Sequence, residues 1–231
     1  MKTSRKTSIF AAGLIVVAAL AHAHGDVAPQ AVNTDALPDV GEEWLTENPY
    51  RAEAAGEEVW LKAVEIGSSG YNQNCARCHG LGVISGGLAP DLRFLEAEEY
   101  GDEWFVERFQ HGYTQNGITK MPAFGEILGQ KAGWAIRTYI ETRPDDVMVT
   151  DQAPRLMELR DELMAMSTGG AGDAAAIQSE LNEIASGIET LSGAPVAVSI
   201  AWEAARSIGE TPESYKHAGE ILTVGLSAAH Y

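Results

Sequence analysis

The stretch Cys75-Ala76-Arg77-Cys78-His79 decides how this chain folds and what it can bind. Its pattern is CxxCH, and it contains the only two cysteines of the sequence, so both thiols serve one purpose. Two thiols at this spacing can add to the two vinyl groups of one haem, and the adjacent imidazole of His79 is then left under the ring to bind iron. The motif therefore predicts one covalently attached haem c, held by Cys75 and Cys78, with His79 as a metal ligand.

Two other interpretations of a CxxC pair are a thioredoxin-like redox pair and half of a zinc site. Neither of them requires a histidine directly after the second cysteine. A zinc site would also need a second pair of ligands, and the body of the chain holds no further cysteine and no closely spaced pair of histidines. The motif thus favours haem over both alternatives.

The N-terminus has the pattern of an export signal. Its first six residues include the bases Lys2, Arg5 and Lys6. An apolar run over 9–20 follows, and the pattern ends at the cleavage-site residues Ala21-His22-Ala23. The apolar run is too short for a comfortable membrane span. We expect residues 1–23 to be a cleaved signal peptide, with a rival cleavage after Ala21, and we expect the mature chain in a bacterial periplasm.

The charge balance limits the kinds of partner. The sequence holds 16 Lys and Arg against 33 Asp and Glu, and three of those bases but no acid lie in residues 1–23, so the mature chain has a net charge of 13 minus 33, or −20. Such a field repels phosphates, and we expect no nucleic-acid partner. It either steers the protein toward a partner with a basic patch or simply keeps an exported protein soluble. The sequence leaves both interpretations open.

Regular structure is expected from Glu57 onward. The apolar residues between Glu57 and Tyr71 fall at helical spacing, and so do those of residues 130–142. Gly67 and Tyr71 lie one turn apart on one face of the first helix, which suits a close crossing with the second. Residues 98–110 are predicted to form a further short, acidic helix.

Two residues beyond the motif are candidates for holding the cofactor. Pro90 lies eleven residues after His79, and its carbonyl can accept the Nδ1 proton of that histidine, which would fix the tautomer and raise the basicity of the ring. Pro90 can equally be an ordinary loop proline. Arg93 can pair with a haem propionate as a partly buried cation, or lie on the surface as a plain arginine.

A second iron ligand is expected from the segment TKMPAFG at 119–125. Met121 is the candidate metal ligand, because Pro122 holds it in an extended conformation from which its thioether can project out of a loop. His111 is a rival, and bis-histidine ligation would lower the reduction potential. The other rivals lie in or beside helical stripes, where methionine more often fills gaps in a core: Met148, Met157, Met164 and Met166.

These features together resemble those of the class I cytochromes c over residues 57–143. The shared features are a helix with Gly67 and Tyr71, the CARCH motif, the loop proline Pro90, the KMP loop and a closing helix with Ile136 and Tyr139. The resemblance implies an all-α haem domain in which Cys75 and Cys78 hold haem c through thioether bonds. It also implies that His79 and Met121 are the two axial iron ligands.

A narrower resemblance rests on three segments, NPYR at 48–51, YNQNCARCHGL at 71–81 and SGGLAPDLR at 85–93. They are similar to segments of the periplasmic cytochromes that accept electrons from pyrroloquinoline-quinone (PQQ) alcohol dehydrogenases. The resemblance implies a one-electron carrier, not an enzyme. Its donor would be a quinoprotein alcohol dehydrogenase, and its acceptor a terminal oxidase or another cytochrome.

The chain continues beyond the point where small cytochromes usually end. We expect an N-terminal arm at 24–56, a cytochrome c domain at 57–149 and a C-terminal helical extension at 150–231. Apolar stripes and turn residues predict four helices in the extension, at 156–166, at 177–191, at 196–208 and from Thr211 onward. The extension contains no cofactor motif. It is either a small helical bundle, within one chain or at an oligomer seam, or a module that docks on a dehydrogenase.

Two other functions remain open on the sequence alone. The chain can be the haem c subunit of another periplasmic oxidoreductase, such as a sulfur-compound dehydrogenase. It can also be an enzyme or a gas-binding haem protein, if Met121 does not bind iron. Ligation by Met121 would exclude the second alternative, because no axial position would then be open to substrate or oxygen.

Overall fold

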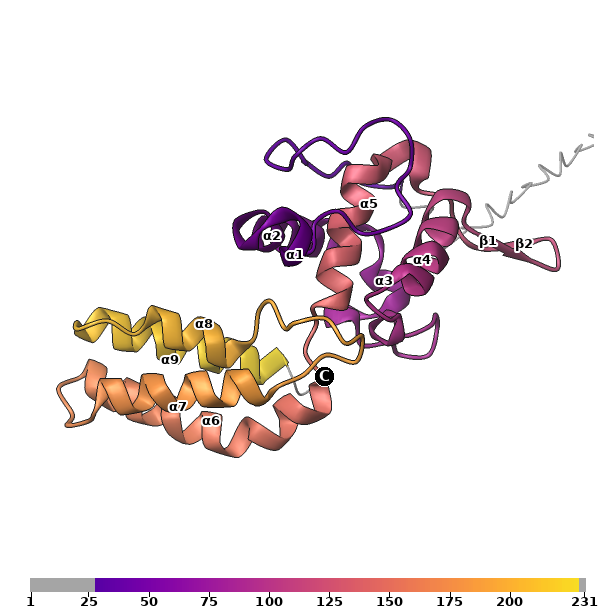
Figure 1. Ribbon diagram of the computed structural model, residues 1–231. Coiled ribbons are helices and arrows are strands. Elements are labelled where there is room, and N and C mark those ends of the chain that lie inside the picture. The colour runs from indigo at the N-terminus through magenta and orange to yellow at the C-terminus, as the bar shows by residue number, and fades with distance from the viewer. Residues whose placement is uncertain (1–27, 229–231) are drawn as a thin grey trace, which may run out of the picture.

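The computed structural model describes residues 28–228, so the expected signal peptide at 1–23 lies outside the described residues. The described part is mostly helical with one two-stranded sheet, which confirms the all-α class (Figure 1). The elements are α1 (Ala52–Ala55), α2 (Glu57–Asn74), α3 (Ala76–His79), the 3₁₀ helices η1 (Leu81–Val83) and η2 (Leu92–Phe94), α4 (Glu99–His111), β1 (Tyr113–Gln115), β2 (Ile118–Met121), α5 (Gly125–Glu141), α6 (Asp146–Ser167), α7 (Ala174–Gly187), α8 (Ile200–Ser207) and α9 (Pro212–Ala228). Between 28 and 228, no helix is long and apolar enough to cross a membrane.

Helices α2 and α5 cross at close range and form the centre of the N-terminal half, as the sequence predicts. A Cβ atom on Gly67 of α2 would overlap the carbonyl oxygen of Ala135 in α5, so only glycine allows this approach. One turn further along α2, the ring of Tyr71 lies 5.5 Å from the ring of Tyr139 in α5. Gly129 has a φ of 76° and interrupts the start of α5, so the regular part of this helix begins at Gln130.

The N-terminal arm contains no helix or strand from residue 28 to residue 51, yet it is firmly attached. The hydroxyl of Tyr50 donates to the carbonyl of Pro38 at 3.1 Å, and burial together with the charge of Asp39 raises the pKa of Tyr50 to about 12. From α5, the side-chain amide of Gln130 donates to the carbonyls of Gly41 and Glu43 at 2.6 and 2.9 Å. The arm is therefore part of the N-terminal half and not a loose leader.

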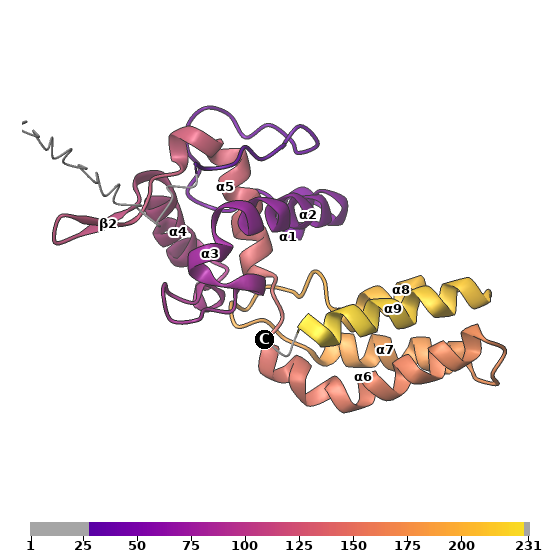
Figure 2. The same ribbon diagram turned by 180° about the vertical axis from the view of Figure 1, so that it is seen from behind.

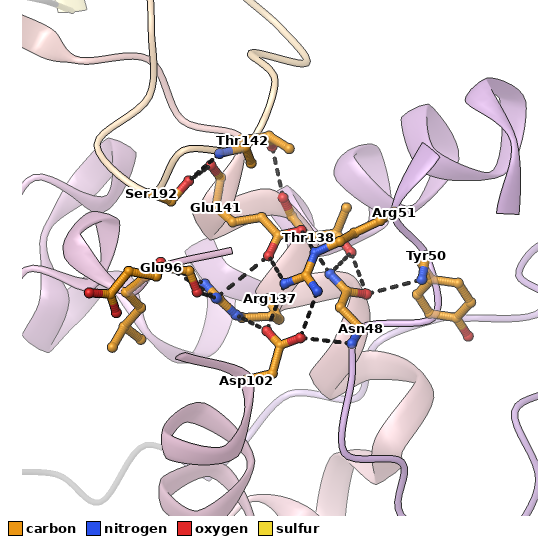
Figure 3. A network of polar contacts seen from close by, with 12 residues as sticks. Asn48, Tyr50, Arg51, Glu96, Asp102, Arg137, Thr138, Glu141, Thr142 and Ser192 are labelled. Carbon is orange, nitrogen blue, oxygen red and sulfur yellow. Dashed lines mark hydrogen bonds and ion pairs between the residues drawn. The ribbon is translucent and has the colours of Figure 1, made fainter. Parts of the chain in front are cut away.

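A buried polar network fastens the end of this arm to α4 and α5 (Figure 3). Arg51 of the arm forms ion pairs with Asp102 of α4 and Glu141 of α5, both at 2.8 Å. Arg137 of α5 donates to Asp102 at 2.8 Å, and the side-chain amide of Asn48 donates to Glu141 at 3.0 Å. Burial raises the pKa of Glu141, although Arg137 and Arg51 act against that rise. Two cations thus face two carboxylates, and removing any one of the four would leave an uncompensated buried charge, at a cost of about 3–5 kcal/mol.

The C-terminal extension is a bundle of four helices, α6 to α9, in the order that the sequence predicts (Figures 1 and 2). Its apolar core is separate from that of the N-terminal half and includes the predicted stripe of Leu156, Leu159, Leu163 and Met166. Thr211 caps α9 through its hydroxyl, which accepts from the backbone N–H of Ser214 at 3.2 Å. Three predicted ends are wrong, because α6 already starts at Asp146, α7 stops at Gly187 and α8 starts only at Ile200.

The segment between α7 and α8, residues 188–199, leaves the bundle and packs on the N-terminal half. The backbone N–H of Asp145 donates to Glu189 at 2.8 Å, and that of Ala97 donates to Ser192 at 2.9 Å. The hydroxyl of Ser192 also donates to the carbonyl of Glu141 at 2.5 Å. Ala197 is buried in the apolar cluster that contains Tyr71 and Tyr139. We call residues 188–199 the return segment.

The expected boundary between the two parts, at 149/150, falls inside a helix. Helix α6 begins at Asp146, and the break between α5 and α6 lies at residues 142–145. Asp145 caps α6, since its carboxylate accepts from the N–H of Val147 at 2.9 Å. The chain therefore passes from the N-terminal half into the C-terminal bundle at residues 142–145. The return segment later adds a second stretch of chain to the N-terminal half.

Candidate haem site

The CxxCH residues occupy one tight turn at the end of α2. The N–H of Cys75 donates to the carbonyl of Tyr71 at 2.8 Å and closes α2, and the N–H of His79 donates to Cys75 at 3.0 Å within the short helix α3. Both cysteines are free thiols. Burial, with a smaller contribution from Cys78, raises the pKa of the Cys75 thiol to about 12. One turn of backbone therefore presents two unpaired thiols and an imidazole.

His79 is buried and held through one ring nitrogen. Its Nδ1 lies 2.9 Å from the carbonyl oxygen of Pro90, which confirms the predicted contact. The loop between them is fixed as well, because the hydroxyl of Tyr71 donates to the carbonyl of Gly80 at 2.8 Å. Gly80 has a φ of 87°, and a Cβ atom there would overlap the carbonyl of Ile84. With Nδ1 used in this hydrogen bond, Nε2 is the nitrogen that can bind a metal.

Met121 is the last residue of β2, in a two-stranded hairpin that the sequence analysis did not predict. Asn116 and Gly117 form its turn with φ values of 52° and 75°, the backbone conformation that an Asn-Gly pair favours. The base of the hairpin is attached to α4 by Arg108, whose guanidinium lies 4.8 Å from the ring of Tyr113. Met121 is extended, as the following proline predicts, and it packs against the same buried cluster as Cys75. The two halves of the predicted site therefore meet at one cluster.

The rival ligands lie in less suitable places. The side chain of His111 is 65% exposed, and its Nε2 lies 3.9 Å from the carboxylate of Glu107. The other methionines of the described part belong to α6 in the C-terminal bundle: Met148, Met157, Met164 and Met166. Met121 is therefore the described methionine that packs on the same cluster as Cys75.

Arg93 is not the surface arginine that the sequence allowed, since it is only 5% exposed. Its guanidinium donates to Asp91 at 2.7 Å and to Asp146, in the first turn of α6, at 2.5 Å. Burial lowers the pKa of Arg93, but the hydrogen bonds to Asp91 and Asp146 outweigh it and leave the pKa raised. Burial would raise the pKa of Asp91, but the bonds from Arg93 outweigh it, and that pKa is lowered. Sequence reasoning missed Asp146, because it lies 53 residues from Arg93 and no local pattern links the two.

The residues present fit a covalently bound haem. One turn of backbone carries two free thiols and a histidine with Nε2 available, and this turn, through Cys75 and Ala76, packs on the same apolar cluster as the thioether of Met121. Thiols can form thioether bonds, and imidazole and thioether are the axial donors of many haem proteins. Haem bound here would supply an iron that changes between the ferrous and the ferric state.

Comparison with known proteins identifies the family of this chain. The family model described as cytochrome C oxidase, cbb3-type, subunit III matches residues 62–140. Cytochrome c550 of Pseudomonas aeruginosa is 52% identical over 135 residues, which are 56% of this chain and 91% of that protein. Two quinohemoprotein alcohol dehydrogenases of Pseudomonas putida, ADH IIB and ADH-IIG, are 33% and 31% identical over 108 and 85 residues, but these matches cover only 14% and 11% of the enzymes. No solved structure matches the chain.

The chain belongs to the cytochrome c family, and it carries the covalently bound haem c that this family implies. It is a c-type cytochrome with a four-helix extension. The matched residues 62–140 run from α2 to α5 and include the CxxCH turn, the Pro90 loop and Met121. They end before the extension begins.

Proposed function

We propose that this cytochrome is a one-electron carrier of the periplasm, not an enzyme. In this proposal Cys75 and Cys78 attach the haem, and His79 and Met121 are its axial ligands. The observation that supports it is that the CxxCH turn, through Cys75 and Ala76, and the side chain of Met121 pack on one apolar cluster. With both positions occupied, only the charge of the iron changes. In the same proposal Arg93 holds a haem propionate in addition to its two carboxylates, Asp91 and Asp146.

We propose a quinoprotein alcohol dehydrogenase as the electron donor and a terminal oxidase or another cytochrome as the acceptor. Support comes from the two quinohemoprotein alcohol dehydrogenases, in which a segment similar to this chain is part of a dehydrogenase. Oxidation of an alcohol releases two electrons, so the donor would reduce two copies of the cytochrome in separate encounters. The export pattern of residues 1–23 supports the periplasm as the compartment.

The test is to mix the oxidised, haem-loaded full chain with a purified PQQ alcohol dehydrogenase and to follow haem reduction by absorbance after alcohol is added. A second reaction replaces the enzyme and alcohol by a sulfur-compound dehydrogenase and its substrate. We expect rapid reduction in the first reaction only. Rapid reduction in the second alone would refute the proposed donor. Binding of carbon monoxide to the reduced protein would show an open axial position and refute the ligand assignment.

A further inference from the structure

The C-terminal extension contains a groove, outside the residues 62–140 that the family model matches. Its walls are the first part of α6 and the last part of α7, two helices that lie side by side in the bundle (Figures 1 and 2). The groove has a volume of about 520 Å³, which is in the range of sites that hold a ligand. We call it the α6–α7 groove.

Part of the lining of the α6–α7 groove is apolar. Met148 of α6 lines it together with Ile184 of α7 and Ile188, which follows that helix. Ile188 is buried, whereas Met148 and Ile184 are only half-buried, so each of these two offers apolar surface to a group that enters the groove. Covering such surface removes it from water and is favourable.

The charged part of the lining is negative. Three carboxylates, those of Asp151, Glu180 and Glu183, line the groove with one guanidinium, that of Arg155. Arg155 is already engaged, because it donates to the carboxylate of Glu180 at 2.5 and 2.6 Å and to that of Glu158 at 2.6 Å. Its positive charge is therefore offset within the bundle.

Two of the three carboxylates remain open. Asp151 on α6 and Glu183 on α7 are exposed, and within residues 28–228 neither carboxylate forms an ion pair. Each wall of the groove thus presents one uncompensated negative charge beside a half-buried apolar side chain. The complement of this arrangement is a positively charged segment that also carries apolar side chains.

We propose that the α6–α7 groove is a docking site for a basic amphipathic helix of another protein. Apolar side chains of that helix would cover Met148 and Ile184, and its lysines or arginines would pair with Asp151 and Glu183. The wall from Met148 to Arg155 is about 10 Å long at 1.5 Å per residue, so one or two turns of the partner enter the groove. A second copy of this chain is not the occupant, because its formal net charge of −17 makes two copies repel each other.

Both walls of the groove continue into contacts with the haem domain. Asp146, two residues before Met148, pairs with Arg93, and Ile188 is the first residue of the return segment. A partner that docks in the groove is therefore held beside the haem domain, at a high effective concentration. The extension would in this way keep a partner close without contributing a residue to the haem site.

The first test measures binding of a synthetic helical peptide to the haem-loaded full chain by calorimetry at about 0.1 M ionic strength. Leucines follow one face of the peptide and lysines flank them, and in the control peptide every lysine is replaced by glutamate. The basic peptide should bind at least tenfold more tightly than the acidic one. Absence of binding by the basic peptide would overturn the proposal, and so would equally tight binding of spermidine, which would indicate a site for small cations.

Charge reversal locates the binding site. Asp151→Lys with Glu183→Lys should weaken peptide binding at least tenfold, because two attractions become repulsions. Glu210→Lys with Glu213→Lys is the matched control, since both residues are exposed at the turn between α8 and α9 and the change in net charge is the same. The control should stay within twofold of the parent. Equal losses in the two double variants would show that net charge alone matters and would refute the groove.

The apolar lining is tested without any change of charge. Met148→Gln should weaken peptide binding about threefold or more, whereas Val147→Gln, at the exposed neighbouring position, should leave it unchanged. In methyl NMR spectra of the reduced full chain, the peptide should shift the signal of Met148 and not that of Met164, which lies near the other end of α6. An unshifted Met148 signal would place the peptide elsewhere and refute the proposal. None of these measurements involves electron transfer, so failure here is distinguishable from failure of the proposed donor.

Discussion

Because the carbonyl oxygen of Pro90 can only accept a hydrogen bond, its contact with Nδ1 of His79 places the proton on that nitrogen. The other nitrogen, Nε2, then has its lone pair free for iron, and the hydrogen bond makes the ring a stronger donor. Tyr71 adds a second restraint through the carbonyl of Gly80. The carbonyl of Pro90 therefore orients the imidazole ring, and the bond to Gly80 holds the backbone directly after His79, so the ring is oriented before any metal is bound.

At the residue scale, the first prediction concerns the distal ligand. Met121→Ala removes the thioether that packs on the same cluster as Cys75, so the weak far-red absorption of methionine bound to ferric haem should disappear and the reduction potential should fall. Met157→Ala is the matched control, since that residue is 36% exposed on α6 in the bundle. Absorption spectra and a redox titration measure both effects. If the band persists in Met121→Ala, another methionine is the ligand, and if the parent lacks it, His111 becomes the favoured ligand.

The second prediction concerns attachment of the haem. Cys75 and Cys78 are free thiols in one turn, and the chain has no third cysteine, so one haem per chain should be bound by two thioether bonds. Extraction with acidified acetone should leave the colour on the protein. Loss of the colour to the solvent would contradict covalent attachment. A haem-to-protein ratio near one, from absorbance and amino-acid analysis, completes the test.

At the scale of elements, the crossing of α2 and α5 holds the site together. Helix α2 ends at Asn74, directly before Cys75, and α5 starts four residues after Met121, so the crossing brings the attachment turn and the distal loop to one cluster. Gly67 sets the distance between the helices, because its missing side chain lets α2 rest on the backbone of α5. The buried network of Arg51, Asp102 and Glu141 then fastens the N-terminal arm across α4 and α5.

The third prediction tests this crossing. Gly67→Ala forces the two helices apart, and overpacking of this kind costs about 1–3 kcal/mol. The melting temperature of the haem domain should fall by roughly 5 °C or more, because a domain of this size loses several degrees per kcal/mol. Gly187→Ala is the matched control at the end of α7, where an added Cβ would meet no atom within 4 Å. Thermal unfolding followed by circular dichroism measures both, and equal melting temperatures would contradict the close crossing.

Much of the structure at the scale of elements could be predicted from local sequence, and the predictions that failed have physical causes. The CxxCH turn, the Pro90 contact and the extended Met121 depend on residues close together in the chain. The apolar period predicted α2 and α5, and the residues from Thr211 onward predicted the start of α9. The apolar stripe predicted an end of α7 that is too late, because Ile188 continues the apolar pattern but is a buried residue of the return segment, outside the helix. Glycine inside a helix costs about 1 kcal/mol relative to alanine, and Gly187 is where α7 stops. The pair of Arg93 and Asp146 could not be predicted, since it depends on how two distant elements pack.

At the scale of the whole molecule, the extension and the haem domain are joined by more than one connection. Asp146 at the start of α6 pairs with Arg93 of the haem domain, and Ser192 of the return segment bonds to the end of α5. Ala197 fills a place in the cluster that also contains Tyr71 and Tyr139. The haem domain is thus completed by residues that follow it in the chain by about fifty positions. A simple division into a carrier and an independent module does not describe this arrangement.

The last prediction follows from that arrangement. A chain cut after Arg143 keeps the proposed attachments and ligands, so it should still bind haem at low temperature. It loses Asp146, which leaves the buried guanidinium of Arg93 with Asp91 alone, and it loses Ala197 from the apolar cluster. We therefore expect its haem domain, followed by haem absorption, to melt at a temperature roughly 5 °C or more below that of the full chain, since burial of even a small apolar side chain and satisfaction of a buried cation each contribute on the order of 1 kcal/mol.

A point variant isolates one part of the effect: Asp146→Ala should lower the melting temperature slightly, because an ion pair with a partly exposed partner contributes about 0.2–1 kcal/mol. Asp151→Ala, on the same helix and with the same change of charge, should leave it unchanged. If the cut chain melts at the same temperature as the full chain, the return segment contributes nothing to the haem domain, and the extension is an independent module after all.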